Sequence, residues 1–317
     1  MLYKLLLFPA RIFLHLYCRR VVINKKEIIS LKGPLLIAAN HPNSFLDAII
    51  LATLFKSPIH SLARGDAFAS KLITRLLSSL NMLPVYRVSE GVENLEHNYG
   101  TFEACQNIFK NNGIVLIFSE GRCINEWRLR PLKKGTARLA LAAWKGEIPL
   151  KVLPLGINYS SFRKFGKTLI LNFGNFITKE EIQEDIYSGK TIIAFNQKLK
   201  HQLEHLVVRI DNDDKQKRKQ QFYFKQPFIK SVLLFVPAFA GLLIHTPLYA
   251  AIHLSIKKRA EDHYDSIFVG LLFFIYPLYV LIITLAVLFI IKSWAALLLL
   301  VLIPFTLWSY VQLSEKV

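Results

Sequence analysis

This sequence has few cysteines and few acidic residues. Its 317 residues include three cysteines, Cys18, Cys105 and Cys123. Their odd number and their spacing fit neither a disulfide framework nor a metal site, which favours a reducing compartment. Against 22 acidic residues stand 40 lysines and arginines, so the net charge is +18. A chain with this charge excess is suited to an anionic partner.

The charge is not accompanied by a nucleic-acid-binding signature, and the basic residues lie beside apolar segments. Hydrophobic residues make up 53% of the chain. Basic charge that faces anionic lipid, with the apolar surplus inside the bilayer, accounts for both observations. The composition therefore predicts a membrane protein whose partners include lipids, and it disfavours a nucleic-acid-binding protein. A chain of this length can also bury a full core.

The start of the chain lacks the pattern of a cleaved signal peptide. Residues 2–17 are apolar but are interrupted by Lys4, Pro9 and Arg11, and no small-residue cleavage site follows. The uninterrupted stretches are shorter than the roughly 20 apolar residues that a membrane span requires. We therefore expect residues 1–20 to form an interfacial membrane helix whose basic residues meet headgroups. A core helix of the soluble domain is the alternative.

Residues 21–210 alternate short apolar runs with helical patterns, which predicts an α/β domain. We expect a mixed sheet with helices on both faces. The expected strands are 35–39, 59–63, 114–118, 151–155 and 168–173. The expected helices are 45–54, 68–80, 95–110, 135–144 and 191–210.

Residues 211–230 are predicted to form a basic juxtamembrane linker. Residues 231–317 are predicted to form a membrane region whose helices lie in the bilayer. The ranges 267–291 and 294–313 are long enough to span as transmembrane helices. The range 231–256 is interrupted by Pro237 and Pro247. A single crossing there would place the basic residues 257–259 opposite the linker. The positive-inside rule therefore favours a re-entrant pair of half-helices turning near residues 245–247, with the α/β domain on the cytoplasmic face.

Two short polar islands follow expected strands. The first is Asn40-His41-Pro42-Asn43-Ser44-Phe45-Leu46-Asp47, and the second is Phe118-Ser119-Glu120-Gly121-Arg122. Ligands bind beyond the carboxyl ends of strands in open α/β sheets, so the islands are placed to form one site. His41 is the natural general base, and Asp47 is close enough to accept its other imidazole N–H.

The second island has the chemistry of an anion site. Gly121 lets the backbone approach a ligand, and Arg122 binds phosphate through two parallel hydrogen bonds. Glu120 would position Arg122 or accept a substrate hydroxyl. Arg87 follows an extended segment, and Lys134 precedes a helix whose N-terminus favours anions.

The first island also contains a serine, Ser44, whose position suits a helix N-cap better than a nucleophile. A His–Asp pair without a nearby nucleophilic serine implies that the nucleophile comes from the substrate.

Four blocks, in order, resemble the glycerolipid acyltransferase superfamily, which includes glycerol-3-phosphate and 1-acylglycerol-3-phosphate acyltransferases. The resemblance covers residues 21–210. Five residues separate His41 from Asp47 where the family usually has four, so the extra residue, Pro42, is expected to bulge from the loop for the pair to meet. Ser119 replaces the usual proline. The longer spacing is similar to that of the branch of glycerol-3-phosphate and dihydroxyacetone-phosphate acyltransferases. The blocks are Asn40-His41…Asp47, Leu83-Pro84-Val85-Tyr86-Arg87, Phe118-Ser119-Glu120-Gly121-Arg122 and Val152-Leu153-Pro154-Leu155-Gly156, with Lys133-Lys134-Gly135 as a lesser match.

The resemblance implies acyl transfer from acyl-CoA or acyl carrier protein to a hydroxyl of glycerol-3-phosphate or its 1-acyl derivative, in phosphatidic acid biosynthesis. His41 would deprotonate that hydroxyl and Asp47 would hold His41. No metal, other cofactor or acyl-enzyme is expected. A lysolipid without phosphate, such as an acylated amino acid, is the alternative acceptor. The residues implied to seat the acceptor are Arg87, Glu120, Gly121, Arg122 and Lys134.

Two other functions stay open. His201-Gln202-Leu203-Glu204-His205 matches a zinc-protease pattern, but its helix is rich in lysine and glutamine, so a solvated face is the simpler interpretation. A non-catalytic membrane scaffold is also compatible with the fold. The intact pair of His41 and Asp47 argues against the scaffold.

Overall fold

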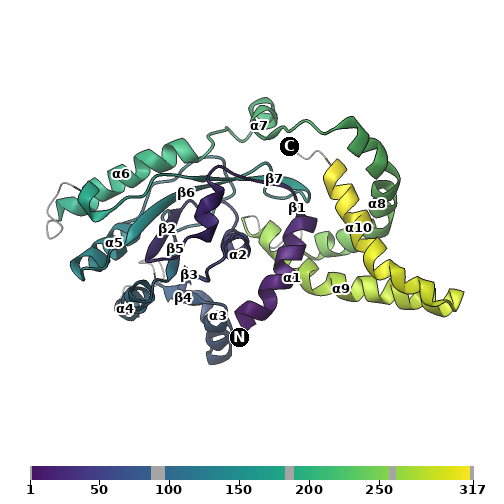
Figure 1. The fold of residues 1–317 in the computed structure, drawn as a ribbon, viewed down its shortest axis with the longest axis horizontal. Helices are drawn as coiled ribbons and strands as arrows, with labels where there is room; N and C mark the ends of the chain where they lie inside the picture. Colours follow the sequence, from purple (N-terminus) through teal and green to yellow (C-terminus); the bar gives the residue numbers. More distant parts are fainter. Residues whose placement is uncertain (1, 87–96, 183–188, 257–261, 315–317) are drawn as a thin grey trace.

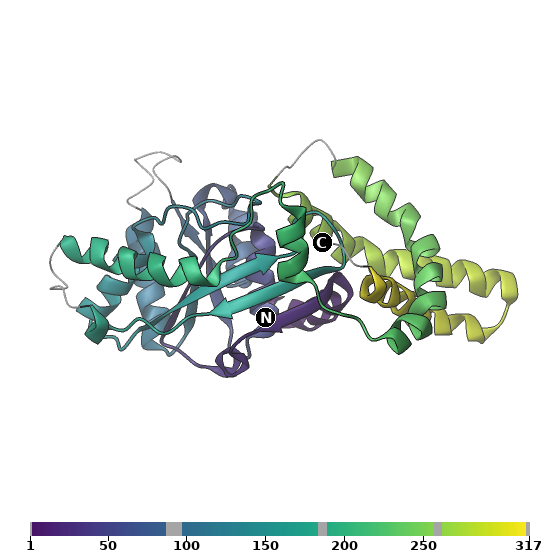
Figure 2. The same ribbon diagram turned by 90° about the horizontal axis from the view of Figure 1, so that it is seen from above.

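The computed structural model describes residues 2–86, 97–182, 189–256 and 262–314. In these residues a seven-stranded mixed sheet has helices on both faces and is followed by three long apolar helices (Figures 1 and 2). The predicted fold class is confirmed.

The sheet has the order β1-β7-β6-β2-β5-β3-β4. Strands β6 and β7 pair antiparallel, and all other neighbours in this order pair parallel. β2 lies between β5 and β6 and is buried along its whole length, as expected for a continuous apolar run. The strands are β1 (Cys18–Ile23), β2 (Leu35–Ala39), β3 (Ile59–Arg64), β4 (Met82–Val85), β5 (Ile114–Phe118), β6 (Lys151–Tyr159) and β7 (Lys167–Phe173).

All five expected strands are present, and the two that were not expected, β1 and β4, are the edges of the sheet. β1 contains Arg19 and Arg20, and β4 contains Pro84. Charged residues and proline are typical of edge strands, where one side of the backbone needs no partner. These residues also remove the apolar pattern by which a strand is recognised from sequence.

The helices that surround the sheet lie close to their expected ranges. α3 begins later than expected because the side chain of Ser70 accepts a hydrogen bond from the Ile73 amide and caps the helix there. α6 ends before residue 207. The helices are α1 (Leu2–Tyr17), α2 (Phe45–Leu54), α3 (Lys71–Ser79), α4 (His97–Lys110), α5 (Gly135–Lys145), α6 (Lys190–Leu206) and α7 (Lys215–Phe222).

The alternation of side chains along β2 divides the core into two layers. Leu35, Ile37 and Ala39 belong to one buried cluster, which includes residues of α1 and α2. Leu36 and Ala38 belong to the other, which includes residues of α4, α5 and α6. The first cluster also contains residues of the three C-terminal helices, so these helices pack directly against one face of the α/β domain.

The C-terminal helices gather at one end of the sheet (Figures 1 and 2). They are α8 (Phe228–Ile256), α9 (Tyr264–Ile291) and α10 (Leu299–Leu313), the last preceded by a 3₁₀ turn, Trp294–Leu298. Among the described residues, three helical segments can cross a membrane by length and composition: α8, α9 and the range Trp294–Leu313. Their orientation relative to a membrane stays a prediction.

The expected turn near residues 245–247 is wrong, because α8 is one continuous helix with Pro237 and Pro247 inside it. Proline removes one backbone hydrogen bond but need not end a helix that neighbouring helices hold in place. Two side chains beside Pro247 also contact carbonyl oxygens one turn earlier in the same helix. His245 Nδ1 lies 2.7 Å from Gly241 O, and Thr246 Oγ1 donates to Leu242 O at 2.5 Å.

α1 ends at Tyr17, so Arg19 and Arg20 lie in β1 and not in the helix expected over residues 1–20. Arg11, expected to meet headgroups, donates from Nε to Thr53 O at 2.8 Å, a carbonyl in the last turn of α2. Leu5 and Phe8 are exposed, whereas Leu14 is buried in the core. An interfacial position for this helix stays a prediction.

A glycine allows α8 and α10 to pack closely. A Cβ atom at Gly241 would lie 2.2 Å from the backbone oxygen of Thr306. We expect Gly241→Ala to lower the thermal unfolding midpoint in detergent, because overpacking a well-packed contact typically costs about 1–3 kcal/mol.

Gly270→Ala in α9 is the matched control, since both variants gain the same helix propensity. Its Cβ would meet Phe45 Cζ at an ordinary contact distance of 3.6 Å, so the midpoint should change little. Equal midpoints for the two variants would contradict the close packing of α8 on α10.

Candidate active site

His41 and Asp47 meet at the carboxyl end of β2. His41 follows the strand, and Asp47 lies in the first turn of α2. His41 Nδ1 is 2.9 Å from Asp47 Oδ2. The side chain of Asp47 is fully buried and that of His41 is 17% exposed. The imidazole lies flat on Phe118, with ring centroids 3.7 Å apart.

The additional residue between His41 and Asp47 is accommodated by the backbone at Ser44. Ser44 has a positive φ of 53°, a conformation that few non-glycine residues adopt. This backbone turn brings α2 back towards the strand end, so the longer spacing does not separate the pair.

Three donors converge on the carboxylate of Asp47. Oδ2 accepts from His41 Nδ1 and, at 2.9 Å, from the backbone amide of Asn43. Oδ1 accepts from the Tyr159 hydroxyl at 2.7 Å. Burial, and then Asp47 itself, raise the pKa of Tyr159 well above its ordinary value, so the phenol stays protonated and donates. This arrangement places the imidazole proton on Nδ1 and leaves the Nε2 lone pair of His41 available to accept a proton.

Glu120 is turned inwards. Its Oε2 accepts from the backbone amide of His41 at 3.0 Å, and its Oε1 accepts from that of Arg130 at 2.8 Å. Burial raises the pKa of Glu120, although these two N–H groups act in the opposite direction. Glu120 therefore holds the backbone at His41 and Arg130, which corrects the expected contact with Arg122.

The second island continues from β5 beside the first. The Ser119 amide donates to Ala39 O at 2.8 Å, which joins the ends of β2 and β5. Gly121 has a positive φ of 64°, which a glycine adopts without strain. Arg122 is exposed, and among the described residues its side chain has no hydrogen bond or ion pair. Lys134 is exposed at the start of α5, and Arg87 lies outside the described residues.

Ser44 occupies the N-cap position of α2, but its side chain makes no capping hydrogen bond. Its Oγ lies instead 2.8 Å from His263 Nδ1. A serine of α9, Ser266, accepts from the Leu46 amide at 3.3 Å and so takes over the cap. The capping role predicted for Ser44 is therefore wrong. Its hydroxyl contacts the imidazole of His263 and not that of His41.

Cys123 lines the same loop. Its Sγ accepts from the Ser44 amide at 2.9 Å. Burial above all, and then the nearby carboxylate of Asp47, raise the pKa of this thiol well above its ordinary value. The thiol is therefore protonated at neutral pH and is a poor nucleophile.

Four supporting residues were missed by reasoning from sequence: Asn43, Tyr159, Asp265 and Ser266. Asn43 is fully buried and donates from Nδ2 to Asp265 Oδ2 at 2.7 Å. Asp265 stands in the first turn of α9. A carboxylate at the start of a long apolar helix is the one signal that was available, since such residues are costly unless they have a task.

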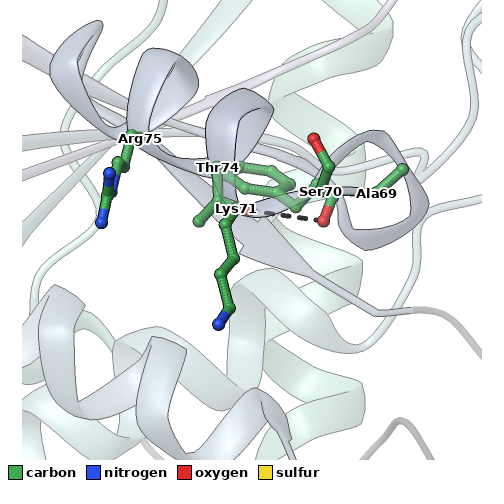
Figure 3. A pocket seen from close by; sticks show the side chains of 6 residues that line it. Ala69, Ser70, Lys71, Thr74 and Arg75 are labelled. Carbon is green, nitrogen blue, oxygen red and sulfur yellow. Dashed lines mark hydrogen bonds between the residues drawn. The ribbon is translucent and has the colours of Figure 1, made fainter.

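Two surface hollows contain none of the residues predicted for the site. One lies beside α3 and is lined by Ser70, Lys71 and Arg75 among others (Figure 3). The other lies between β7 and α6 and includes His201 and His205. Within the described ranges, no three His, Cys, Asp or Glu side chains are grouped closely enough to hold a metal ion. The zinc-protease interpretation therefore lacks a donor set there.

Comparison with known proteins agrees with the geometry. The family model described as Acyltransferase matches residues 20–158, a range that contains both polar islands and the ends of β2 and β5. Residues 20–158 thus match the acyltransferase family. The family predicted from the motifs is thus confirmed.

Two known proteins are similar to this chain. Glycerol-3-phosphate O-acyltransferase 2 of Saccharomyces cerevisiae is 28% identical over 120 residues, which are 37% of this chain and 15% of the yeast protein. The chain thus spans a small part of that relative. The crystal structure of the 1-acyl-sn-glycerophosphate (LPA) acyltransferase PlsC from Thermotoga maritima is 13% identical, with a TM-score of 0.45. The match covers 71% of this chain and 83% of that one.

Proposed function

We propose that this chain is a membrane-bound O-acyltransferase of phospholipid biosynthesis. It transfers a fatty acyl group from acyl-CoA or acyl carrier protein to a hydroxyl of glycerol-3-phosphate or 1-acylglycerol-3-phosphate. The observation that carries this proposal is the His41–Asp47 pair, with its 2.9 Å contact at the end of a buried strand. The match of residues 20–158 to the acyltransferase family supports the reaction class.

The geometry suits general-base catalysis with the substrate as nucleophile. His41 Nε2 takes the proton of the acceptor hydroxyl while the hydroxyl oxygen attacks the thioester carbonyl carbon. The C–S bond then breaks, and the thiolate leaves and recovers the proton from His41. Asp47 holds the Nδ1–H and stabilises the imidazolium formed in between. Ser44 is bonded to His263 and Cys123 is protonated, so neither side chain favours a covalent acyl-enzyme.

The acceptor phosphate is assigned to the basic residues beside the second island. Arg122 is exposed just after Gly121, and Lys134 opens α5. Within the described residues no carboxylate pairs with this guanidinium, which leaves it available for bidentate phosphate binding. Arg87 is the third residue of this proposed set. Glu120 acts by holding His41 at the edge of the site rather than by touching the phosphate.

The proposed setting is the cytoplasmic face of a membrane. The three C-terminal helices would anchor the domain, and the net charge of +18 suits a surface of anionic lipids. An acceptor that carries an acyl chain would then enter the site from the bilayer, and a soluble thioester would enter it from the cytoplasm.

The test is release of free thiol from a long-chain acyl-CoA by the detergent-solubilised protein. Glycerol-3-phosphate and 1-acylglycerol-3-phosphate are supplied separately, each beside the His41→Ala variant. We expect release that depends on one acceptor and is lost in the variant. If neither acceptor supports release, acyl carrier protein as donor and a lysolipid without phosphate are tested next. Absence of transfer in all of these would overturn the proposal and favour a non-catalytic scaffold.

A further inference from the structure

The first turn of α9 is polar and buried, although the rest of the helix is apolar. Asp265 is 3% exposed and Ser266 is fully buried. Neither residue faces solvent or takes part in the proposed chemistry. Each contacts the catalytic loop of the α/β domain, residues 40–47, which lies more than 200 positions away in the sequence.

Asp265 is the centre of a buried polar cluster. Its Oδ2 accepts hydrogen bonds from Lys167 Nζ in β7 and from the Tyr17 hydroxyl at the end of α1. Burial lowers the pKa of Lys167, although the charge of Asp265 acts against that shift. A buried ion pair is weak evidence for stability, since an apolar pair of similar volume is often as good. A role in positioning gives a reason for such a cluster at this place.

The cluster continues into the catalytic loop through Asn43. Asn43 Nδ2 donates to Asp265 Oδ2 at 2.7 Å, and the Asn43 amide donates to Asp47 Oδ2 at 2.9 Å. Ser266 Oγ donates to Asn43 O at 2.8 Å and accepts from the Leu46 amide at 3.3 Å. The first turn of α9 thus holds the loop on both sides of Ser44, whose backbone is strained by its positive φ.

We propose that the first turn of α9 positions the His41–Asp47 pair, with Asp265 and Ser266 as positioning residues. This proposal rests on the proposed function for its kinetic consequences. A helix that belongs to the predicted membrane region then completes the active site as well as anchoring it. Displacing the loop by about 1 Å would misplace Asp47 and His41, an error that can lower a rate by about 10²-fold.

The test compares Ser266→Ala with Ser309→Ala in the full-length, solubilised protein. Both serines are fully buried in C-terminal helices. Among the described residues, however, the hydroxyl of Ser309 donates only to a carbonyl of its own helix, Phe305 O, at 2.8 Å. We expect kcat for thiol release to fall about tenfold or more in Ser266→Ala, with KM nearly unchanged. Ser309→Ala should keep both constants, and Ser266→Thr, which retains the hydroxyl, should recover much of kcat.

A second readout does not depend on acyl transfer. Diethyl pyrocarbonate modifies unprotonated imidazole, and mass spectrometry measures its rate at His41. We expect that rate to fall in Ser266→Ala, because Nε2 loses the electron density that Asp47 supplies through Nδ1. If the wild type transfers no acyl group, the proposed function fails, and the rate at His41 alone decides the positioning role. An unchanged or faster rate in Ser266→Ala would overturn the positioning role.

A double variant covers the case in which Ser266→Ala does not fold. Lys167→Met combined with Asp265→Leu replaces the buried pair by apolar side chains and leaves no unpaired charge. It also removes the contact from Asp265 to Asn43. We expect a folded protein with reduced kcat and slower modification of His41. Wild-type values for both would contradict the proposal.

Discussion

Replacing His41 with alanine is expected to lower the rate of acyl transfer by about 10²- to 10⁴-fold, the contribution typical of a general base. The variant should stay folded. The imidazole is partly exposed, and without it Asp47 keeps the hydrogen bonds from the Asn43 amide and the Tyr159 hydroxyl. The measurement is initial thiol release at saturating acyl-CoA, together with the thermal unfolding midpoint.

His201→Ala is the control for this variant. His201 lies on α6 and lines the hollow between that helix and β7, whose lining includes neither His41 nor Asp47, so its loss should leave the rate unchanged. Near-wild-type activity in His41→Ala would exclude the general-base mechanism. Equal losses in both variants would point to a general effect on the protein rather than on the site.

Asp47→Asn is expected to have the second largest effect, a loss of about 10²- to 10⁴-fold in kcat, because the carboxylate fixes the imidazole tautomer. Three donors converge on the carboxylate in the structure, two of them on Oδ2. An amide has one acceptor oxygen, so its NH₂ group must face at least one N–H or O–H donor. If the NH₂ group faces His41, Nδ1 becomes its acceptor and the imidazole proton moves to Nε2, which blocks the base. If the NH₂ group faces the Tyr159 hydroxyl oxygen instead, the neutral amide no longer stabilises the imidazolium. Steady-state kinetics, with KM and kcat determined separately, measures the loss.

Tyr159→Phe is the matched control for Asp47→Asn. It removes one donor to Asp47 Oδ1 and leaves the contact between His41 and Asp47 Oδ2 in place. Its loss of kcat should therefore be much smaller. If Tyr159→Phe and Asp47→Asn lost the same factor in kcat, the hydrogen bond from His41 Nδ1 to Asp47 would not be the contact on which the rate depends.

The sequence predicted those parts of the fold that depend on neighbouring residues. β2 and β5 are central parallel strands buried on both faces, so each appears as a continuous apolar run, and their ends are marked by the polar residues that follow. The pair of His41 and Asp47 could also be predicted, because a strand end and the first helical turn after it lie close together whatever the rest of the chain does.

Predictions from local patterns were wrong where contacts with other segments stabilise a structure that the local sequence does not favour. Pro237 and Pro247 indicated a break in α8, but the packed helix continues through both. Arg19 in β1 and Pro84 in β4 hid strands that need pairing on one side only. Ser44 had the residue type of a helix cap, yet the cap of α2 is Ser266 from another helix.

The sequence alone determined the family blocks, the α/β class and the order of the polar islands. Tertiary structure alone decided what supports the dyad. Tyr159 reaches Asp47 across 112 positions, Lys167 reaches Asp265 across 98, and Asn43 reaches Asp265 across 222. A buried carboxylate needs hydrogen-bond donors but does not specify which residues provide them. Any donor that folding brings within reach can serve, so no local pattern in the chain records that choice.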